Sequence, residues 1–186
     1  MAVSWVSVEA PEPVGGVSVA VTTAGAAAVA FSAEPPAEVP ALLASAPGAD
    51  AERTALVARQ VAEYLAGRRR VFDFPVDWSL TSGAQRTVLQ ALHRTVGYGR
   101  TVTYGELAAG SGVYDGVAPG ERWAGARSVG QIMGSNPVAL IVPCHRVVAS
   151  DGLGGFGGGY GGVEVKRWLL TLEGVLPPTL DWNGPA

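Results

Sequence analysis

The sequence predicts an α+β fold, in which a small N-terminal domain of β-sheet and helix precedes a mostly helical C-terminal domain with a helix-turn-helix. Near the N-terminus, valines alternate with small or polar residues, which is the pattern of a half-buried strand. After residue 82 the apolar residues recur instead at helical spacing. An extended segment that contains a proline, residues 72–78, separates the two patterns. We therefore expect domains at residues 1–80 and 81–186, and we expect the first to be structural.

The N-terminal elements are predicted to be a hairpin followed by one helix. Residues 14–22 and 26–31 form the two strands, and residues 23–25 form the turn between them. Residues 34–47 are rich in proline and alanine and are predicted to be a loop. Asp50 is suited to start a helix that runs to about Ala66, where Gly67 ends it.

The C-terminal part is predicted to hold four helices. The first starts at Ser82, and the others occupy residues 105–109, 124–134 and 163–172. The second and third suggest a helix-turn-helix, because both are short and the third is rich in alanine and glycine. The loop between them, residues 110–123, is longer than the usual turn of about 3–4 residues.

The composition is that of a compact soluble protein, with 48% apolar and 16% charged residues. One cysteine cannot form an intramolecular disulfide, and with two histidines it cannot make a typical structural zinc site. The most apolar stretch, residues 14–31, is broken by glycine and threonine, and the first basic residue is Arg53. It therefore fits neither a secretory signal nor a membrane helix. We expect a cytoplasmic monomer with no membrane partner and no metal.

The charge is unevenly distributed along the chain. The net charge is −3, but the acidic excess lies in the first 82 residues. Residues 86–105 and 122–146 each contain three arginines and no acid. A local basic face can bind phosphates even on an acidic protein, because salt screens charges beyond about 10 Å. The distribution is thus compatible with a nucleic-acid partner.

The only cysteine, Cys144, is followed directly by His145 and Arg146. A free cysteine is usually a small buried apolar residue. Here, however, the two following side chains do not belong unpaired in an apolar core, and a neighbouring cation lowers the pKa of a thiol. On this evidence Cys144 is either an inert buried residue or a nucleophile. As a base, His145 must come within about 3 Å of the thiol or act through one water. Glu173 either orients the imidazole or is a solvated acid at a helix end.

Glycines dominate the segment after the cysteine. Gly152, Gly154 and Gly157 fit the dinucleotide-binding pattern G-x-G-x-x-G, but eight of the eleven residues at 152–162 are glycine. The match therefore carries little information, and no following strand completes a βαβ unit. A wall that lets a flat ligand approach the backbone closely is the better interpretation.

Five segments together resemble the O6-alkylguanine-DNA alkyltransferases (methylated-DNA–protein-cysteine methyltransferases). The resemblance extends in order from about residue 82 to residue 176, and PCHRVV is its most specific part. The matching segments are VTYGELA at 102–108, ARSVG at 126–130, NPV at 136–138, IVPCHRVV at 141–148 and KRWLLTLEG at 166–174.

The resemblance implies a DNA repair protein that transfers an alkyl group irreversibly to its own cysteine. Cys144 would attack the alkyl carbon on guanine O6, and each molecule would act once because the thioether is stable. His145 would take the thiol proton through a water, with Glu173 holding the imidazole. Tyr104 would donate a proton toward the guanine ring, and Asn136 would pin the turn that presents the thiol.

The implied partner is double-stranded DNA that contains O6-alkylguanine, with O4-alkylthymine as a further substrate and no cofactor. Arg127, Ser128 and Arg146 are the expected DNA contacts. Arg127 would fill the space left by the flipped nucleotide, since O6 of a stacked base is out of reach of the thiol.

The same resemblance implies a base pocket in which the carbonyls of Cys144 and Val147 receive the exocyclic amine of guanine. Either Phe156 or Tyr160 supplies the aromatic wall, with Phe156 slightly preferred. The loop at 110–123 and the glycine tract at 152–162 are both longer than in the family. These departures affect the range of alkyl groups and the DNA contacts rather than the reaction.

Three other functions compete with this interpretation. A non-catalytic relative that only binds alkylated bases would lack the cysteine, which is present here. A cysteine hydrolase would need His93 as its base and an oxyanion hole. A helix-turn-helix regulator without chemistry would leave Cys144 and His145 unexplained.

Overall fold

A computed structural model of the chain describes residues 3–36, 41–116, 122–156 and 162–185. The N-terminal part is a three-stranded antiparallel sheet in the order β1-β2-β3, with β1 at Ser4–Glu9, β2 at Gly16–Thr22 and β3 at Gly25–Ala30. The predicted hairpin is confirmed as β2 and β3. Strand β1 was not predicted, although Val6 and Val8 alternate with Ser7 and Glu9 and could have revealed it.

Two helices accompany the sheet. Helix α2, Ala51–Leu65, begins as predicted at Asp50, whose side chain accepts a hydrogen bond from the Arg53 amide at 2.8 Å. It packs along β1 and β2 through an apolar face that includes Val57 and Val61. The predicted loop at residues 34–47 is wrong in part, because it contains the short helix α1, Ala41–Ala44, which buries Leu43.

Residues 72–78, which connect the two parts, form backbone hydrogen bonds with the sheet. The Ala26 amide donates to the Pro75 carbonyl at 3.0 Å, and the Asp77 amide donates to the Ala26 carbonyl at 2.8 Å. Glycine is required at residue 25, where φ is +137° and an added Cβ would lie 2.1 Å from the Pro75 oxygen. This pairing fixes the start of the helical part against the edge strand β3.

The C-terminal part consists of four helices and a small parallel sheet. The helices are α3 at Gly83–Thr95, α4 at Tyr104–Gly110, α5 at Arg122–Gly134 and α6 at Gly162–Leu172. They agree with the four predicted helices to within two residues at each end. The sheet pairs β4, Val102–Thr103, with β5, Val147–Val148. This pairing brings the N-terminus of α4 beside the residues that follow the cysteine.

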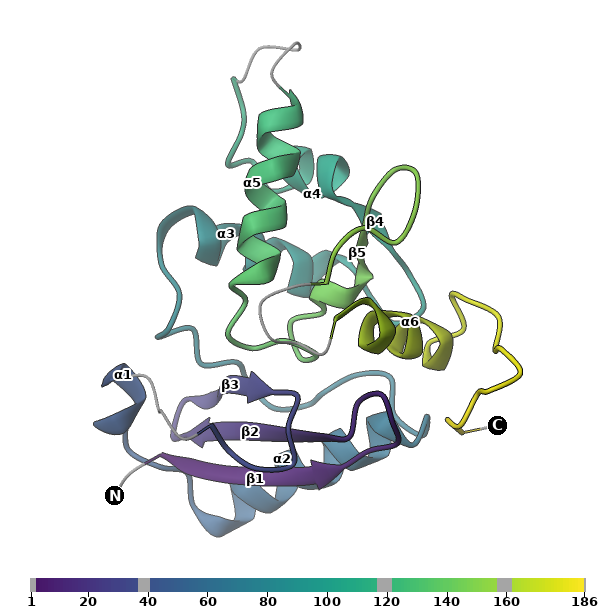
Figure 1. The fold of residues 1–186 in the computed structure, drawn as a ribbon. Helices are drawn as coiled ribbons and strands as arrows, with labels where there is room; N and C mark the ends of the chain where they lie inside the picture. Colours follow the sequence, from purple (N-terminus) through teal and green to yellow (C-terminus); the bar gives the residue numbers. More distant parts are fainter. Residues whose placement is uncertain (1–2, 37–40, 117–121, 157–161, 186) are drawn as a thin grey trace.

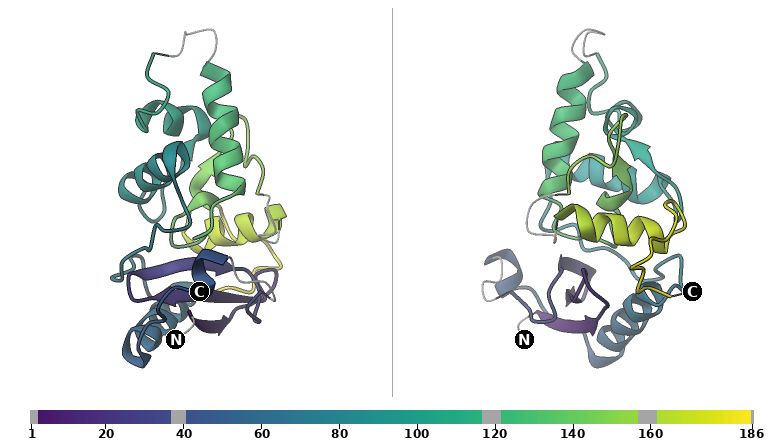
Figure 2. Two further views of the ribbon diagram at one scale, coloured as in Figure 1. Left: turned by 90° about the vertical axis from the view of Figure 1, so that its left-hand side faces the viewer. Right: turned by 45° about the vertical axis from the view of Figure 1, so that its right-hand side comes forward.

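Helices α4 and α5 pack directly against each other and against α3 (Figures 1 and 2). They are the pair predicted to form the helix-turn-helix. Thr103 caps α4 in a reciprocal pair of hydrogen bonds with Glu106. Figure 1 shows the sheet below the helical part, with β3 nearest to it. Within the described ranges, no helix has the length and apolar character needed to cross a membrane.

Candidate active site

The cysteine sits on a short 3₁₀ turn, Cys144–Arg146, at the end of the buried apolar run 138–142. The Asn136 side chain bridges this run: it accepts from the Val138 amide at 3.0 Å and donates to the Val142 carbonyl at 2.9 Å. Leu140 within the loop has a positive φ of 72°, an unusual conformation for a residue with a side chain. Asn136 thus holds the turn that presents Cys144.

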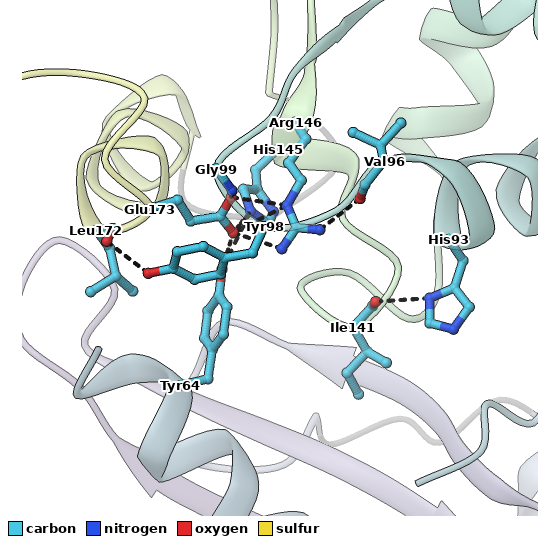
Figure 3. Close-up of polar contacts among 10 residues, drawn as sticks. All are labelled: Tyr64, His93, Val96, Tyr98, Gly99, Ile141, His145, Arg146, Leu172 and Glu173. Carbon is cyan, nitrogen blue, oxygen red and sulfur yellow. Dashed lines mark hydrogen bonds and ion pairs between the residues drawn. The ribbon is translucent and has the colours of Figure 1, made fainter. Parts of the chain in front are cut away.

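A buried cluster lies directly after the thiol, around the carboxylate of Glu173 (Figure 3). His145 Nε2 is 2.9 Å from Oε1 of Glu173. Arg146 donates to both carboxylate oxygens, through Nε at 2.9 Å to Oε2 and through Nη2 at 2.8 Å to Oε1. The Gly99 amide donates to Oε2 at 3.1 Å. Glu173 therefore orients the imidazole rather than facing solvent.

The protonation of this cluster follows from its surroundings. Burial raises the pKa of Glu173, but the hydrogen bonds from His145 and Arg146 and the charge of Arg146 outweigh it and hold the pKa well below the usual range. Burial lowers the pKa of His145 more than Glu173 raises it, so the imidazole is neutral at neutral pH. Because Nε2 faces a carboxylate, we assign the hydrogen to Nε2. The lone pair on Nδ1 is then available to accept a proton.

The thiol itself rests in its protonated form. Burial raises the pKa of Cys144 to about 11, against the opposing effects of the Asn136 hydrogen bond and the Lys166 charge. At neutral pH a base must therefore remove the proton before the sulfur can act as a nucleophile. The basic nitrogen of His145 is suited to that task.

Cys144 opens into a cleft of about 360 Å³, within the size range of small-ligand pockets. The cleft brings together the N-terminus of α4, one face of α5 and the wall after β5. Its lining residues are Tyr104, Arg127, Gly130, Met133, Gly134, Cys144, Gly155 and Phe156. A larger hollow of about 630 Å³ lies along α2, but its lining residues include neither a cysteine nor a histidine. We therefore place the candidate active site at the smaller cleft.

Several predicted site residues meet in this cleft. The Tyr104 hydroxyl donates to the Gly155 carbonyl at 3.2 Å, and burial raises its pKa, so it remains a donor. Arg127 is exposed at the rim, and Ser128 beside it accepts a hydrogen bond from the Tyr114 hydroxyl at 2.6 Å. Phe156, which was slightly preferred over Tyr160 as the aromatic wall, lines the cleft. Tyr160 lies outside the described residues.

The structure changes the expected place of Arg146 and adds evidence against the hydrolase alternative. Arg146 was expected to contact DNA, but only 7% of it is exposed, and its guanidinium is bound to Glu173 and to the Val96 carbonyl. The structure therefore assigns Arg146 to the buried cluster, because a buried carboxylate needs a counter-charge. His93 donates from Nδ1 to the Ile141 carbonyl at 3.2 Å and lines a different cavity from Cys144, which disfavours a Cys144–His93 hydrolase.

Lys166 is a site residue that sequence reasoning missed. Its ammonium group donates to the Val147 carbonyl at 2.6 Å and to the Gly155 carbonyl at 3.1 Å. Burial lowers its pKa to about 8. Lys166 thus joins the two segments that form one wall of the cleft. The sequence signal that could have revealed its burial was its position between Val165 and Trp168, on the apolar face of α6.

Comparison with known proteins decides the family. The model of the family described as "6-O-methylguanine DNA methyltransferase, DNA binding domain" matches residues 83–175, which is half of the chain. The chain belongs to the 6-O-methylguanine DNA methyltransferase family. The match includes α3 to α6 and all the cleft residues named above.

Individual relatives agree with this assignment. A methylated-DNA–protein-cysteine methyltransferase from Mycolicibacterium paratuberculosis is 44% identical over 115 residues, which cover 61% of this chain and 61% of the relative. Another from Salmonella typhimurium is 41% identical over 118 residues, which cover 63% of this chain and 61% of the relative. The chain thus aligns with about three fifths of the length of these relatives.

The likeness in structure extends further along the chain. The crystal structure of Mycobacterium tuberculosis OGT in complex with DNA matches with a TM-score of 0.67 at 32% identity, over 91% of this chain and 92% of that one. The O6-methylguanine-DNA methyltransferase of Pyrococcus kodakaraensis, at 23% identity and a TM-score of 0.62, shows the same fold. The predicted α+β fold class is confirmed.

Among the described residues, no group of three or more His, Cys, Asp or Glu side chains is placed to hold a metal ion.

The buried carboxylate gives a prediction about stability. Glu173→Gln should lower the free energy of unfolding by about 3 kcal/mol at neutral pH, because Arg146 loses its counter-charge while remaining buried. The folded-state pKa of Glu173 is lowered, so its contribution is complete above the unfolded value of about 4.3 and is lost as the pH falls below it. The difference between wild type and variant should therefore begin to narrow at about pH 5 and keep narrowing as the pH falls toward the lowered folded-state pKa.

Urea unfolding at several pH values checks this expectation. Glu164→Gln, an exposed glutamate in the first turn of α6, is the matched control and should change stability by less than about 1 kcal/mol. A Glu173→Gln effect that stays constant with pH would contradict the assignment.

Proposed function

We propose that this chain repairs DNA by transferring an alkyl group from O6 of guanine irreversibly to the sulfur of Cys144. The observation that carries the proposal is the cleft itself. The buried thiol of the only cysteine lines a pocket of small-ligand size, beside a protonated tyrosine and an exposed arginine, while the adjacent imidazole is neutral. Family membership and the DNA complex of the Mycobacterium tuberculosis relative support the same function.

The chemistry follows from the protonation states. The thiol proton passes to Nδ1 of His145, directly or through one water. The sulfur then forms a bond to the alkyl carbon as the bond from that carbon to O6 breaks, and the electron pair goes to the guanine ring. The Tyr104 hydroxyl donates a proton to the ring, and the proton held on His145 replaces it through solvent. The products are guanine and S-alkylcysteine.

Each molecule acts once in this scheme, because a thioether is not hydrolysed under cellular conditions. No cofactor is needed, since the acceptor is part of the chain. O4-alkylthymine carries the same alkoxy group on a flat ring, and we propose it as a second substrate. The Val147 carbonyl already accepts a hydrogen bond from Lys166, but a carbonyl has two lone pairs and can still receive the exocyclic amine of guanine.

The exposed face of α5 is the surface that DNA would meet. Trp123, Arg127 and Gln131 follow one another at four-residue spacing and are all exposed. The described part of α5 carries no acidic residue, so this face would not repel phosphates. Arg127 also lines the cleft. We propose that its side chain fills the space left in the duplex when the damaged base moves into the pocket. We expect the protein to act on double-stranded DNA as a monomer.

Mass spectrometry tests the proposed reaction. After incubation with a duplex that carries one O6-methylguanine, the peptide with Cys144 should gain one methyl group and the duplex should lose its lesion, in a one-to-one ratio. Cys144→Ala should bind the same duplex without repairing it. An unmodified peptide beside an unrepaired duplex would refute the proposal.

The role of Arg127 gives a separate expectation. Arg127→Ala should slow transfer from duplex DNA by about 10- to 100-fold, because extruding a base costs a few kcal/mol that the side chain offsets. Transfer from a single strand should change by less than about threefold, since little stacking has to be broken. Arg167→Ala removes an exposed arginine from α6 and serves as the charge-matched control. Equal slowing on duplex and single strand would contradict the role in extrusion.

A further inference from the structure

The N-terminal part contributes a side chain to the cluster around Glu173. Tyr64 lies in the last turn of α2, is only 1% exposed, and points toward Glu173 and His145 (Figure 3). Its ring is held by Phe72 at a centroid distance of 5.3 Å and by Tyr98 at 6.0 Å. The position of its hydroxyl is therefore fixed by packing.

The hydroxyl of Tyr64 shares one carboxylate oxygen with His145. It donates to Oε1 of Glu173 at 2.5 Å, and it lies 3.4 Å from Nε2 of His145. His145 Nε2 is 2.9 Å from the same Oε1. Burial, followed by the Glu173 charge, raises the pKa of Tyr64 well above its ordinary value, so the phenol stays protonated and remains a donor.

This shared oxygen has two consequences for His145. A donor on Oε1 restricts rotation of the carboxylate and so keeps the imidazole in one orientation. It also takes up part of the negative charge that would otherwise stabilise the protonated imidazole. The other charged groups that face His145 are Arg146 and Lys166, which both disfavour its protonation.

We propose that Tyr64 is a positioning residue for alkyl transfer: its hydroxyl holds Oε1 of Glu173 against His145 and limits the carboxylate charge that His145 experiences. The N-terminal part then influences the reaction as well as supporting the structure, because Tyr64 acts on His145, which accepts the thiol proton. This proposal rests on the proposed function for its role in repair, but its effect on His145 is independent of DNA.

Tyr64→Phe tests it, because this change removes the hydroxyl and keeps the ring. Tyr98→Phe is the matched control: its hydroxyl donates at 2.9 Å to the Leu172 carbonyl in the same region but not to Glu173. The rate of Cys144 methylation is measured against pH by mass spectrometry in two reactions. One uses a duplex with O6-methylguanine, and the other uses iodomethane without DNA, which gives the same S-methyl product.

We expect Tyr64→Phe to move the acidic limb of both rate profiles to higher pH by about one unit, since a hydrogen bond to a charged group has about that effect. The rate at the acidic end should fall about tenfold, and the rate above pH 8 should stay within about threefold of wild type. Tyr98→Phe should leave both profiles in place. A merely structural role would lower the rate equally at every pH.

Unshifted profiles for Tyr64→Phe, or equal shifts for both variants, would overturn the proposal. If wild type reacts with iodomethane but not with the damaged duplex, the proposed function fails. The iodomethane profiles would still decide whether Tyr64 acts on His145.

Discussion

The carboxylate of Glu173 is buried and ionised, and this combination is stable only because donors surround it. Those donors come from distant parts of the chain: Tyr64 from α2, the Gly99 amide from the loop after α3, and His145 and Arg146 from the turn after the cysteine. One ionic group therefore joins the N-terminal part, the end of α6 and the reactive turn. Loss of Arg146 would leave the Glu173 charge unpaired in the interior, and the neutral donors fix the carboxylate further, so the cluster favours a single arrangement of these elements.

In the proposed function, the thiol is protonated at rest and reacts only when a substrate occupies the cleft, and the same cluster supplies the base. Burial keeps Cys144 protonated at neutral pH, and the protonated thiol is a weaker nucleophile than the thiolate. Burial also keeps His145 neutral, and Glu173 fixes which nitrogen carries the hydrogen. Reactivity then depends on a substrate that reaches the cleft between α4, α5 and the Lys166-bound wall. In the proposed function, a flipped alkylated base is that substrate.

Local patterns in the sequence predicted most of the fold, because helix periodicity, the Asp50 cap and the alternating valines are short-range signals. The thiol, its neighbouring histidine and the Glu173 partner were also identified from the sequence and its resemblance to a family. What the sequence could not give were contacts between distant residues. From the sequence, Tyr64 was placed on the apolar face of α2 and Arg146 was expected to contact DNA. The fold places both on Glu173. The burial of Lys166 is likewise explained only by the fold, in which its ammonium group donates a hydrogen bond to the Val147 carbonyl in the wall of the cleft.

The account depends most on the state of one imidazole ring. Nitrogen-15 NMR of the protein at neutral pH reports the protonation of both ring nitrogens of His145, and a His93→Gln variant assigns the signals because the chain has only two histidines. The account predicts a neutral ring with hydrogen on Nε2 and none on Nδ1, and it predicts that Glu173→Gln disturbs this state. A protonated ring, or a neutral ring with its hydrogen on Nδ1, would contradict the account, because His145 could then not accept the proton of Cys144.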